Sequence, residues 1–213
     1  MNTHNYLRPK WAGQTLTNFS KIVVFILLFI SLKSTAQVDL TSTGGTTTGT
    51  FTTLKGAFDA INAGTHQEVI TIEITVNTTE TATAELIASG TGSANYSAVD
   101  IYPTQSGLRI TINSTSATLI RLNGADNVTF DGRVNRTGTS VDLEIVNTST
   151  SANANIFEFI NGASNNIIEY CLRGFGTKAM FNFGTTSISN GNNNNIIRKN
   201  KLTNNGGDNY FEL

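Results

Sequence analysis

The chain has 213 residues, and its 14 basic and 15 acidic side chains give a formal net charge of −1. Four of the basic residues lie in the first 36 residues, so the remainder is acidic, and this sign argues against a nucleic-acid partner, because phosphate binding depends on clustered Lys and Arg. The single cysteine, Cys171, excludes an intramolecular disulfide and a metal site built from several cysteines.

Residues 1–36 have the pattern of a secretory signal peptide. Lys21 precedes an apolar run of eleven residues, 22–32, whereas a membrane-spanning helix needs about 20. The segment Ser34-Thr35-Ala36 follows, with small residues, Ser34 and Ala36, at both positions that a signal peptidase reads. We expect cleavage before Gln37, a secreted or cell-surface location, and no membrane span afterwards. A buried core helix or a retained anchor is the alternative reading of the same run.

Residues 37–213 are expected to form one domain. The leader carries four of the basic residues and no acidic one, so 10 basic and 15 acidic residues remain. Asn and Thr supply 59 of the 213 residues, a bias that is also found in disordered chains, but the regular spacing of apolar residues argues for folding. We expect this domain to be incomplete at its C-terminal end, because no polar terminal cap of the kind a solenoid needs follows the last repeat.

The first predicted element is a short amphipathic helix over residues 52–62. Leu54, Phe58 and Ile61 follow one another at helical spacing and fall on one face. Thr52 or Thr53 can cap its first turn.

Short β-strands are predicted for most of the remaining chain. Apolar and polar residues alternate strictly in the segments 70–76, 108–112 and 141–145, as in half-buried strands. Shorter segments with the same pattern are 99–101, 119–122, 128–130, 157–159, 181–183 and 196–197. Clusters of Gly, Asn, Ser and Thr separate them, which is typical of turns.

The motif Asn-Gly-x-x-Asn-x-x-apolar occurs three times, beginning at residues 123, 161 and 190. Its members are Gly124, Gly162 and Gly191, then Asn127, Asn165 and Asn194, and finally Phe130, Ile168 and Ile197. The successive glycines are 38 and 29 residues apart, a distance that suits one coil of a parallel β-solenoid. We expect the apolar residues to form one core column and the asparagines to form a ladder at a shared corner, where Gly permits positive φ.

The segments FTTLKGAFDAIN, NVTFDG, NNIIEYC and NNIIRKN resemble the pectin-lyase-like right-handed parallel β-helix family. Together with the leader they are also similar to the start of large secreted surface proteins of Bacteroidota-type bacteria, over residues 37–210. The resemblance implies an all-β fold: a right-handed parallel β-helix, or solenoid, with a short N-terminal capping α-helix.

Catalytic patterns are sparse. Pectin-lyase-like enzymes use calcium held by carboxylates with an Arg or Lys base, or paired carboxylates, but this sequence contains no Asp-Asp pair. His66, the histidine that remains after cleavage, is interpreted as a polar loop residue, because a catalytic histidine needs a positioned partner. We therefore predict no catalytic residue, no metal site and no cofactor, and favour a non-enzymatic protein.

The densest polar group surrounds the segment NVTFDG. Its candidate ligand-binding residues are Asp126, Asp131, Arg133 and Arg136. The two carboxylates could hold a cation while Arg133 binds an acidic sugar. The structural alternative, which we favour, makes Asp131 part of a turn and the arginines loop charges.

These patterns predict a secreted or cell-surface structural and adhesive module that binds an extracellular polysaccharide or a cell-surface glycan. Tyr96, Tyr102 and Tyr170 could stack on sugars, although core packing is the alternative for each. The competing hypothesis is a fragment of a polysaccharide lyase or glycoside hydrolase of pectin-lyase-like fold. The sequence leaves the oligomeric state open.

Overall fold

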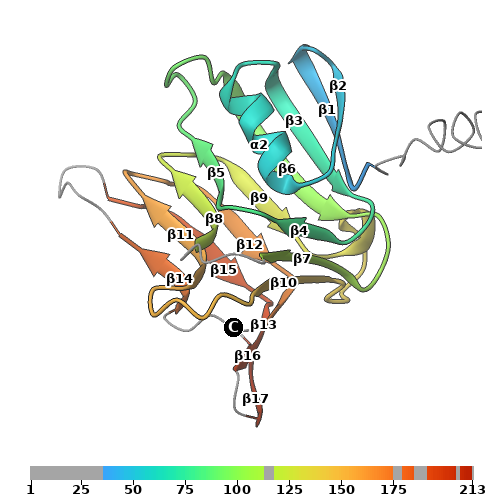
Figure 1. Cartoon of the computed structure of the whole chain (residues 1–213), viewed down its shortest axis with the longest axis vertical. Helices are drawn as coiled ribbons and strands as arrows, with labels where there is room; N and C mark the ends of the chain where they lie inside the picture. Colours follow the sequence, from blue (N-terminus) through green and yellow to red (C-terminus); the bar gives the residue numbers. More distant parts are fainter. Residues whose placement is uncertain (1–35, 113–117, 175–178, 185–190, 205–206, 213) are drawn as a thin grey trace, which may run out of the picture. The chain divides into compact units, whose positions relative to one another are not determined.

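The computed structural model describes residues 36–112, 118–174, 179–184, 191–204 and 207–212 (Figure 1). The predicted signal peptide lies outside the described residues, apart from Ala36. Residues 36–213 group as one compact unit. In the described ranges, no helix combines the length and the apolar character needed to cross a membrane.

The described residues form three β-sheets, one α-helix, α2 (Leu54–Asn62), and one 3-10 turn, η1 (Val134–Arg136). Sheet A contains β1 (Val38–Gly45), β2 (Thr48–Phe51), β3 (His66–Ile74), β6 (Tyr96–Pro103), β9 (Val128–Asp131), β12 (Ile167–Glu169) and β15 (Ile196–Arg198). Sheet B contains β4 (Thr78–Glu80), β7 (Leu108–Ile112), β10 (Leu143–Asn147), β13 (Cys171–Gly174), β16 (Lys201–Asn204) and β17 (Gly207–Glu212). Sheet C contains β5 (Ala84–Ile87), β8 (Thr118–Asn123), β11 (Asn155–Ile160) and β14 (Ala179–Phe183).

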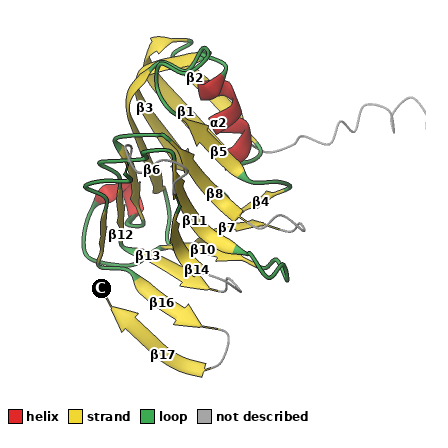
Figure 2. Ribbon diagram, turned by 90° about the vertical axis from the view of Figure 1, so that its left-hand side faces the viewer, coloured by secondary structure: helices red, strands yellow, loops and turns green. Residues whose placement is uncertain are grey.

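From β3 to β16, each sheet takes every third strand of the chain. Strands β3, β6, β9, β12 and β15 pair in parallel in sheet A, and sheets B and C repeat the pattern with the strands that follow each of them. Figure 2 shows these strands following one another from the α2 end toward the β16–β17 hairpin. The prediction of an all-β protein is therefore confirmed, with parallel pairing dominant.

The predicted core column is confirmed by the strand register. Ile168 pairs with Phe130 on one side and with Ile197 on the other, so the three residues lie at one position of neighbouring strands. Phe130 and Ile168 are fully buried, whereas Ile197 of β15 is only partly buried. Phe130 also packs edge to face on Phe157 of sheet C, with ring centroids 5.0 Å apart, so the column joins two sheets.

Helix α2 forms as the sequence predicts, although it begins two residues later. Thr53 is the N-cap, and its side chain accepts a hydrogen bond from Gly56 N at 3.0 Å. Leu54, Phe58 and Ile61 are fully buried on its inner face. Two antiparallel strands, β1 and β2, precede the helix, and the sequence analysis did not predict them.

Both ends of α2 bond to edge strands of the other two sheets (Figure 1). Leu54 N and Lys55 N donate to the carboxylate of Glu80 in β4 at 2.9 and 2.8 Å. At the other end, the Asn62 amide donates to Glu85 O of β5 and accepts from Ile87 N. The helix thus satisfies backbone groups on β5 that no neighbouring strand of sheet C reaches.

The motif asparagines lie at left-handed corners before β9, β12 and β15. Asn127, Asn165 and Asn194 have φ values of 60°, 58° and 54°, and Gly124 and Gly162 have φ values of 70° and 85°. The exposed amides are joined by a bond of 3.3 Å from Asn194 to Asn165, whereas Asn127 donates instead to the carbonyl of Ser97. The corner at Gly191 is tied to the corner before it, because the Ser164 hydroxyl donates to the carbonyls of both Gly162 and Gly191.

A second asparagine column, which was not predicted from the sequence, lies immediately beside the first, and its later member, Asn195, is partly buried. Asn166 is fully buried; it accepts from Val128 N at 2.9 Å and donates to Ala125 O at 2.9 Å. Asn195 repeats this arrangement one strand later, accepting from Asn166 N and donating to Ala163 O. Each of these amides therefore satisfies backbone groups of the preceding turn that would otherwise be buried without partners.

Candidate functional site

The four predicted candidate residues do not form one site. Asp126 accepts a hydrogen bond of 2.7 Å from Ser164 N, so it braces the turn before β12. Asp131 and Arg133 pair with each other, while Arg136 pairs with Asp100 in β6 at 2.8 Å. These contacts do not gather the four residues around one ligand position, as the prediction of a shared ligand would require.

Asp131 belongs to a charged row at the C-terminal ends of β9, β12 and β15. In the parallel register Asp131 is the neighbour of Glu169, and Glu169 is the neighbour of Arg198. The Asp131 and Glu169 side chains are only 3% and 9% exposed, so two adjacent carboxylates are held in a poorly hydrated position. Such a pair requires compensating positive charge.

Arg133 supplies much of that charge. Its guanidinium bonds Asp131 through Nε at 2.9 Å and through Nη2 at 2.6 Å, and Nη2 lies 3.4 Å from Glu169 Oε1. Arg198 Nε donates to the other Glu169 oxygen at 2.8 Å. The hydrogen bond to Asp131 raises the pKa of Arg133 further above its usual value, so this arginine stays charged. The group is a closed ion-pair network without a free carboxylate.

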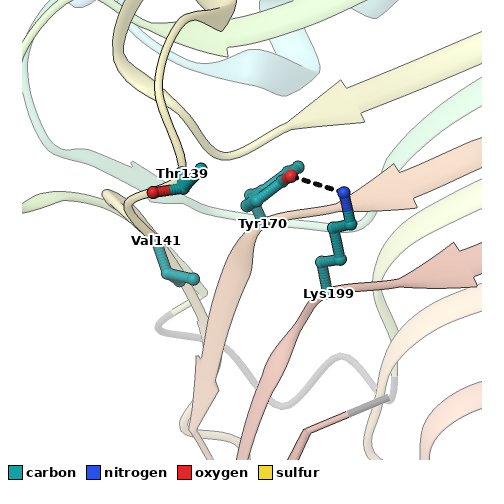
Figure 3. Close-up of a pocket in the computed structure, with 4 residues that line it drawn as sticks. All are labelled: Thr139, Val141, Tyr170 and Lys199. Carbon is teal, nitrogen blue, oxygen red and sulfur yellow. Dashed lines mark hydrogen bonds between the residues drawn. The ribbon is translucent and has the colours of Figure 1, made fainter.

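Tyr170 and Lys199 follow this row at the next corner and line a pocket with Thr139 and Val141 (Figure 3). The pocket has a volume of about 280 Å³. The Lys199 ammonium donates to the Tyr170 hydroxyl at 2.8 Å and lies 5.1 Å from the ring centroid. Arg133 lies over the same ring at 4.3 Å. We call the four lining residues, Thr139, Val141, Tyr170 and Lys199, the Tyr170 pocket.

A second aromatic group lies on sheet A, which we call the Tyr102 cluster: Glu73, Asp100, Tyr102 and Arg136. The Tyr102 hydroxyl donates to Glu73 at 2.8 Å, and the Arg136 guanidinium, paired with Asp100, lies 6.0 Å from the Tyr102 ring centroid. Partial burial, followed by the bond to Glu73, raises the pKa of Tyr102 to about 12. The phenol therefore remains a neutral donor at any physiological pH.

His66 corrects the sequence analysis, which placed it in a polar loop. It opens β3 and is only 2% exposed. Its Nδ1 lies 2.5 Å from Thr46 O, and its ring packs edge to face on Phe51. This environment gives His66 a structural role in holding the β1–β2 hairpin against β3.

Tyr96 is also a packing residue, in line with the structural alternative for the tyrosines. It is 5% exposed, and its hydroxyl donates to Ile87 O at 2.6 Å. Burial raises its pKa well above the usual value for tyrosine. Within the described residues, no group of three or more His, Cys, Asp or Glu side chains is arranged to hold a metal ion.

The sequence did not lead us to predict that Glu169, Tyr170, Arg198 and Lys199 gather near Asp131. The signal was nevertheless present, because the motif spacings of 38 and 29 residues, applied to Asp131, lead to Glu169 and then to Arg198. The same spacings predict the apolar column, whereas the sequence around Asp131 alone does not point to Glu169 or Arg198.

In the comparisons with known proteins, no family model, no curated protein and no solved structure matches this chain. The function of the candidate sites is therefore inferred from their geometry alone.

Proposed function

We propose that the chain is an exported β-solenoid module with a structural and adhesive role, which binds carbohydrate on the outer face of sheet A. In this proposal residues 37–213 wind as a right-handed parallel β-helix, with one strand of each sheet in every coil. The parallel register of the core column supports this winding, because residues 38 and 29 positions apart become neighbours.

Helix α2 caps the N-terminal end of the coil stack in this proposal. Its support is the pair of bonds to β4 and β5, which are edge strands of sheets B and C. An uncovered end of a stack of parallel strands presents backbone donors and acceptors on which another chain can pair, and natural proteins cover such edges with a helix or loop. The same arrangement is expected from the resemblance to pectin-lyase-like proteins and to bacterial surface proteins.

The observation that carries the carbohydrate proposal is the Tyr102 cluster. Tyr102 is half-buried, so part of its ring remains accessible beside a guanidinium and two carboxylates, those of Arg136, Glu73 and Asp100. An aromatic ring can pack on the apolar face of a sugar while planar charged groups bond its hydroxyls. Glu73, Asp100 and Tyr102 lie on the paired strands β3 and β6, and Arg136 of η1 is tied to Asp100, so the cluster is held in place without a ligand.

The competing proposal, a fragment of a polysaccharide lyase or glycoside hydrolase, requires a carboxylate or arginine that is available for proton transfer. Asp131, Glu169 and Arg133 instead neutralise one another, which favours the non-enzymatic role. A direct assay for unsaturated uronate release distinguishes the two proposals. Calcium-dependent release that is abolished in the variant Asp131→Asn with Arg133→Gln would establish the enzyme.

A glycan array probed with the purified chain tests the binding proposal. We expect at least one glycan class to bind, and Tyr102→Ala to weaken that binding about tenfold or more, a loss of about 1.4 kcal/mol. The matched control is Arg109→Gln on the outer face of sheet B, where Arg109 pairs with Glu144 in the same register geometry. This control should change binding by less than about threefold, under 1 kcal/mol.

Asp131 and Arg133, two of the ligand-binding candidates predicted from the sequence, provide a separate test. Because Asp131 and Arg133 neutralise each other, removing both should leave glycan binding within about threefold. The proposal is wrong if no glycan binds, or if Tyr102→Ala and Arg109→Gln lose binding equally.

A further inference from the structure

The Tyr170 pocket combines a cavity with a cation that lacks an anionic partner. Among the described residues, the cations that pair with a carboxylate are Lys55, Arg109, Arg121, Arg133, Arg136 and Arg198. Lys199, like Lys201, is outside this set: no described carboxylate lies within ion-pair distance of its ammonium, which donates to the Tyr170 hydroxyl. An ammonium has three donors, so two remain available to a ligand or to water.

The charged row beside the pocket is balanced without Lys199, and Asp142, next to the pocket residue Val141, adds a further carboxylate that bonds Ser106 and Val134 N. Asp131 and Glu169 carry two negative charges, and Arg133, Arg198 and Lys199 carry three positive ones. The arginines are engaged by the carboxylates, so Lys199 is the exposed cation of the pocket lining that has no described carboxylate partner. An anion placed there would gain charge-assisted hydrogen bonds without competing with an existing ion pair.

The backbone at the pocket is held in an unfavourable conformation. Tyr170 and Lys199 have φ values of 51° and 54°, in the left-handed region that bulky side chains avoid. The corresponding corner one strand earlier is Gly132, where any side chain would collide with the Tyr170 carbonyl. Asn or Gly would suit the two later corners better, so a Tyr and a Lys there point to a role for their side chains.

We propose that the Tyr170 pocket binds one anionic group, a carboxylate or a sulfate ester, carried on a ring-sized polar molecule. Lys199 bonds the anion, and Thr139, Val141 and the edge of the largely buried Tyr170 ring contact the body of the ligand (Figure 3). The volume of about 280 Å³ is just below the range of about 300 to 1,000 Å³ for small-molecule pockets, so a single ring unit fits. This site shares no residue with the Tyr102 cluster.

Isothermal titration calorimetry of the purified chain with three probes tests the proposal: sodium glucuronate, glucose 6-sulfate and neutral glucose. At low ionic strength we expect at least one anionic probe to bind about tenfold more tightly than glucose. The two anionic probes separate the carboxylate source from the sulfate source, because the tighter one identifies the favoured group. Binding should weaken as salt is added, since Lys199 is exposed and its charge is screened.

Lys199→Gln should weaken binding of the anion about tenfold or more, and Lys199→Arg should recover most of the loss, because charge is retained. The matched control is Lys201→Gln, which removes the same charge from an exposed residue outside the pocket lining and should stay within about twofold. Tyr102→Ala should leave this binding unchanged, which separates the result from the glycan proposal. If Lys199→Gln fails to fold, Thr139→Phe, which narrows the cavity from an exposed loop position, carries the test with a loss of about tenfold.

The proposal is overturned by any of three results. These are equal binding of glucose and both anions, equal losses in the Lys199→Gln and Lys201→Gln variants, and unchanged binding in the Lys199→Gln variant. The last result would show that Lys199 serves only to hold Tyr170 in place.

Discussion

At the scale of single residues, burial separates the two asparagine columns although they are adjacent in sequence. Asn165 is exposed and bonds another exposed amide, whereas Asn166 is fully buried and bonds the backbone of the preceding turn. An exposed bond exchanges with water and contributes little, but a buried backbone group left without a partner costs about 1 to 3 kcal/mol. The structural contribution is therefore expected from the second column.

Asn166→Ala should lower the free energy of unfolding by about 3 kcal/mol, because Val128 N and Ala125 O both lose their partner. Urea denaturation followed by circular dichroism measures the change. The neighbouring control, Asn165→Gly, keeps a residue that accepts positive φ and should cost less than about 1 kcal/mol. Equal costs for the two variants would contradict the assignment of the buried column.

The ion-pair network predicts a non-additive result. Arg133→Gln alone leaves Asp131, 3% exposed, and Glu169 with too little positive charge, and should destabilise the fold by about 3 kcal/mol. Asp131→Asn combined with Arg133→Gln removes both charges and should cost clearly less than the single change. A double-mutant cycle of unfolding free energies measures this difference. A double variant that is less stable than Arg133→Gln would show that the charges are not coupled as described.

The position of a single residue in the fold could be predicted from the sequence only where a motif repeats. The motif gave the column of Phe130 and Ile168 because a fixed spacing recurs in the chain. Asn166 lies inside the run of asparagines beside Asn165, so composition alone could not distinguish the buried amide from the exposed one. That distinction depends on which residue turns inward at the corner, and this is set by the left-handed conformation of Asn165.

At the scale of elements, helix α2 is anchored by a buried acid. Glu80 is fully buried, and burial raises its pKa above the ordinary 4.5 although two backbone N–H groups of the helix oppose the shift. Between pH 4.5 and the raised pKa, the folded chain holds a proton that the unfolded chain releases. Stability from this group is therefore full at low pH and is lost as the pH rises through the raised pKa.

Glu80→Gln removes this titration while keeping an acceptor for the helix N-terminus. The difference in unfolding free energy, wild type minus Glu80→Gln, should fall as the pH rises from 4.5 through the raised pKa. Thermal or urea unfolding over a series of pH values measures it. A difference that grows with pH would mean that the helix N-terminus stabilises the ionised carboxylate more than burial disfavours it.

The helix and about half of the strands were predicted from their pattern; β1, β2, β4, β5, β13, β16 and β17 were not, and several of these have a physical cause. The helix and strands such as β7 show clear periodicity, so their residues were identified. Strands β1 and β2 were missed because Gly and Thr interrupt the alternation after Leu40, and pairing with β3 is what holds them. Strand β4 has three residues, and its Glu80 is buried only because the helix covers it.

At the scale of the whole described unit, regular parallel pairing brings together residues that are far apart in sequence. It places Asp131, Glu169 and Arg198 side by side and creates the corner where Tyr170 and Lys199 meet. The ligand chemistry of such a corner could not be predicted from local sequence, since its members come from three different strands and loops. The core column was predictable because hydrophobic burial imposes the same residue type in each repeat.

The central claim is that residues 38 positions apart are register neighbours in sheet A. Thr129 and Ile167 are Cα partners on parallel strands, which lie about 4.8 Å apart, within the range of about 4.4 to 6.8 Å that a disulfide spans. The direct measurement is disulfide formation in the variant Thr129→Cys with Ile167→Cys, carrying Cys171→Ser, quantified by mass spectrometry after oxidation. The comparison pair, Thr129→Cys with Ile168→Cys, slips by one residue and places its second thiol in the core. We predict an intramolecular disulfide in most molecules of the first pair and in few of the second; equal or preferred cross-linking of the slipped pair would contradict the register, and the stacked fold with it.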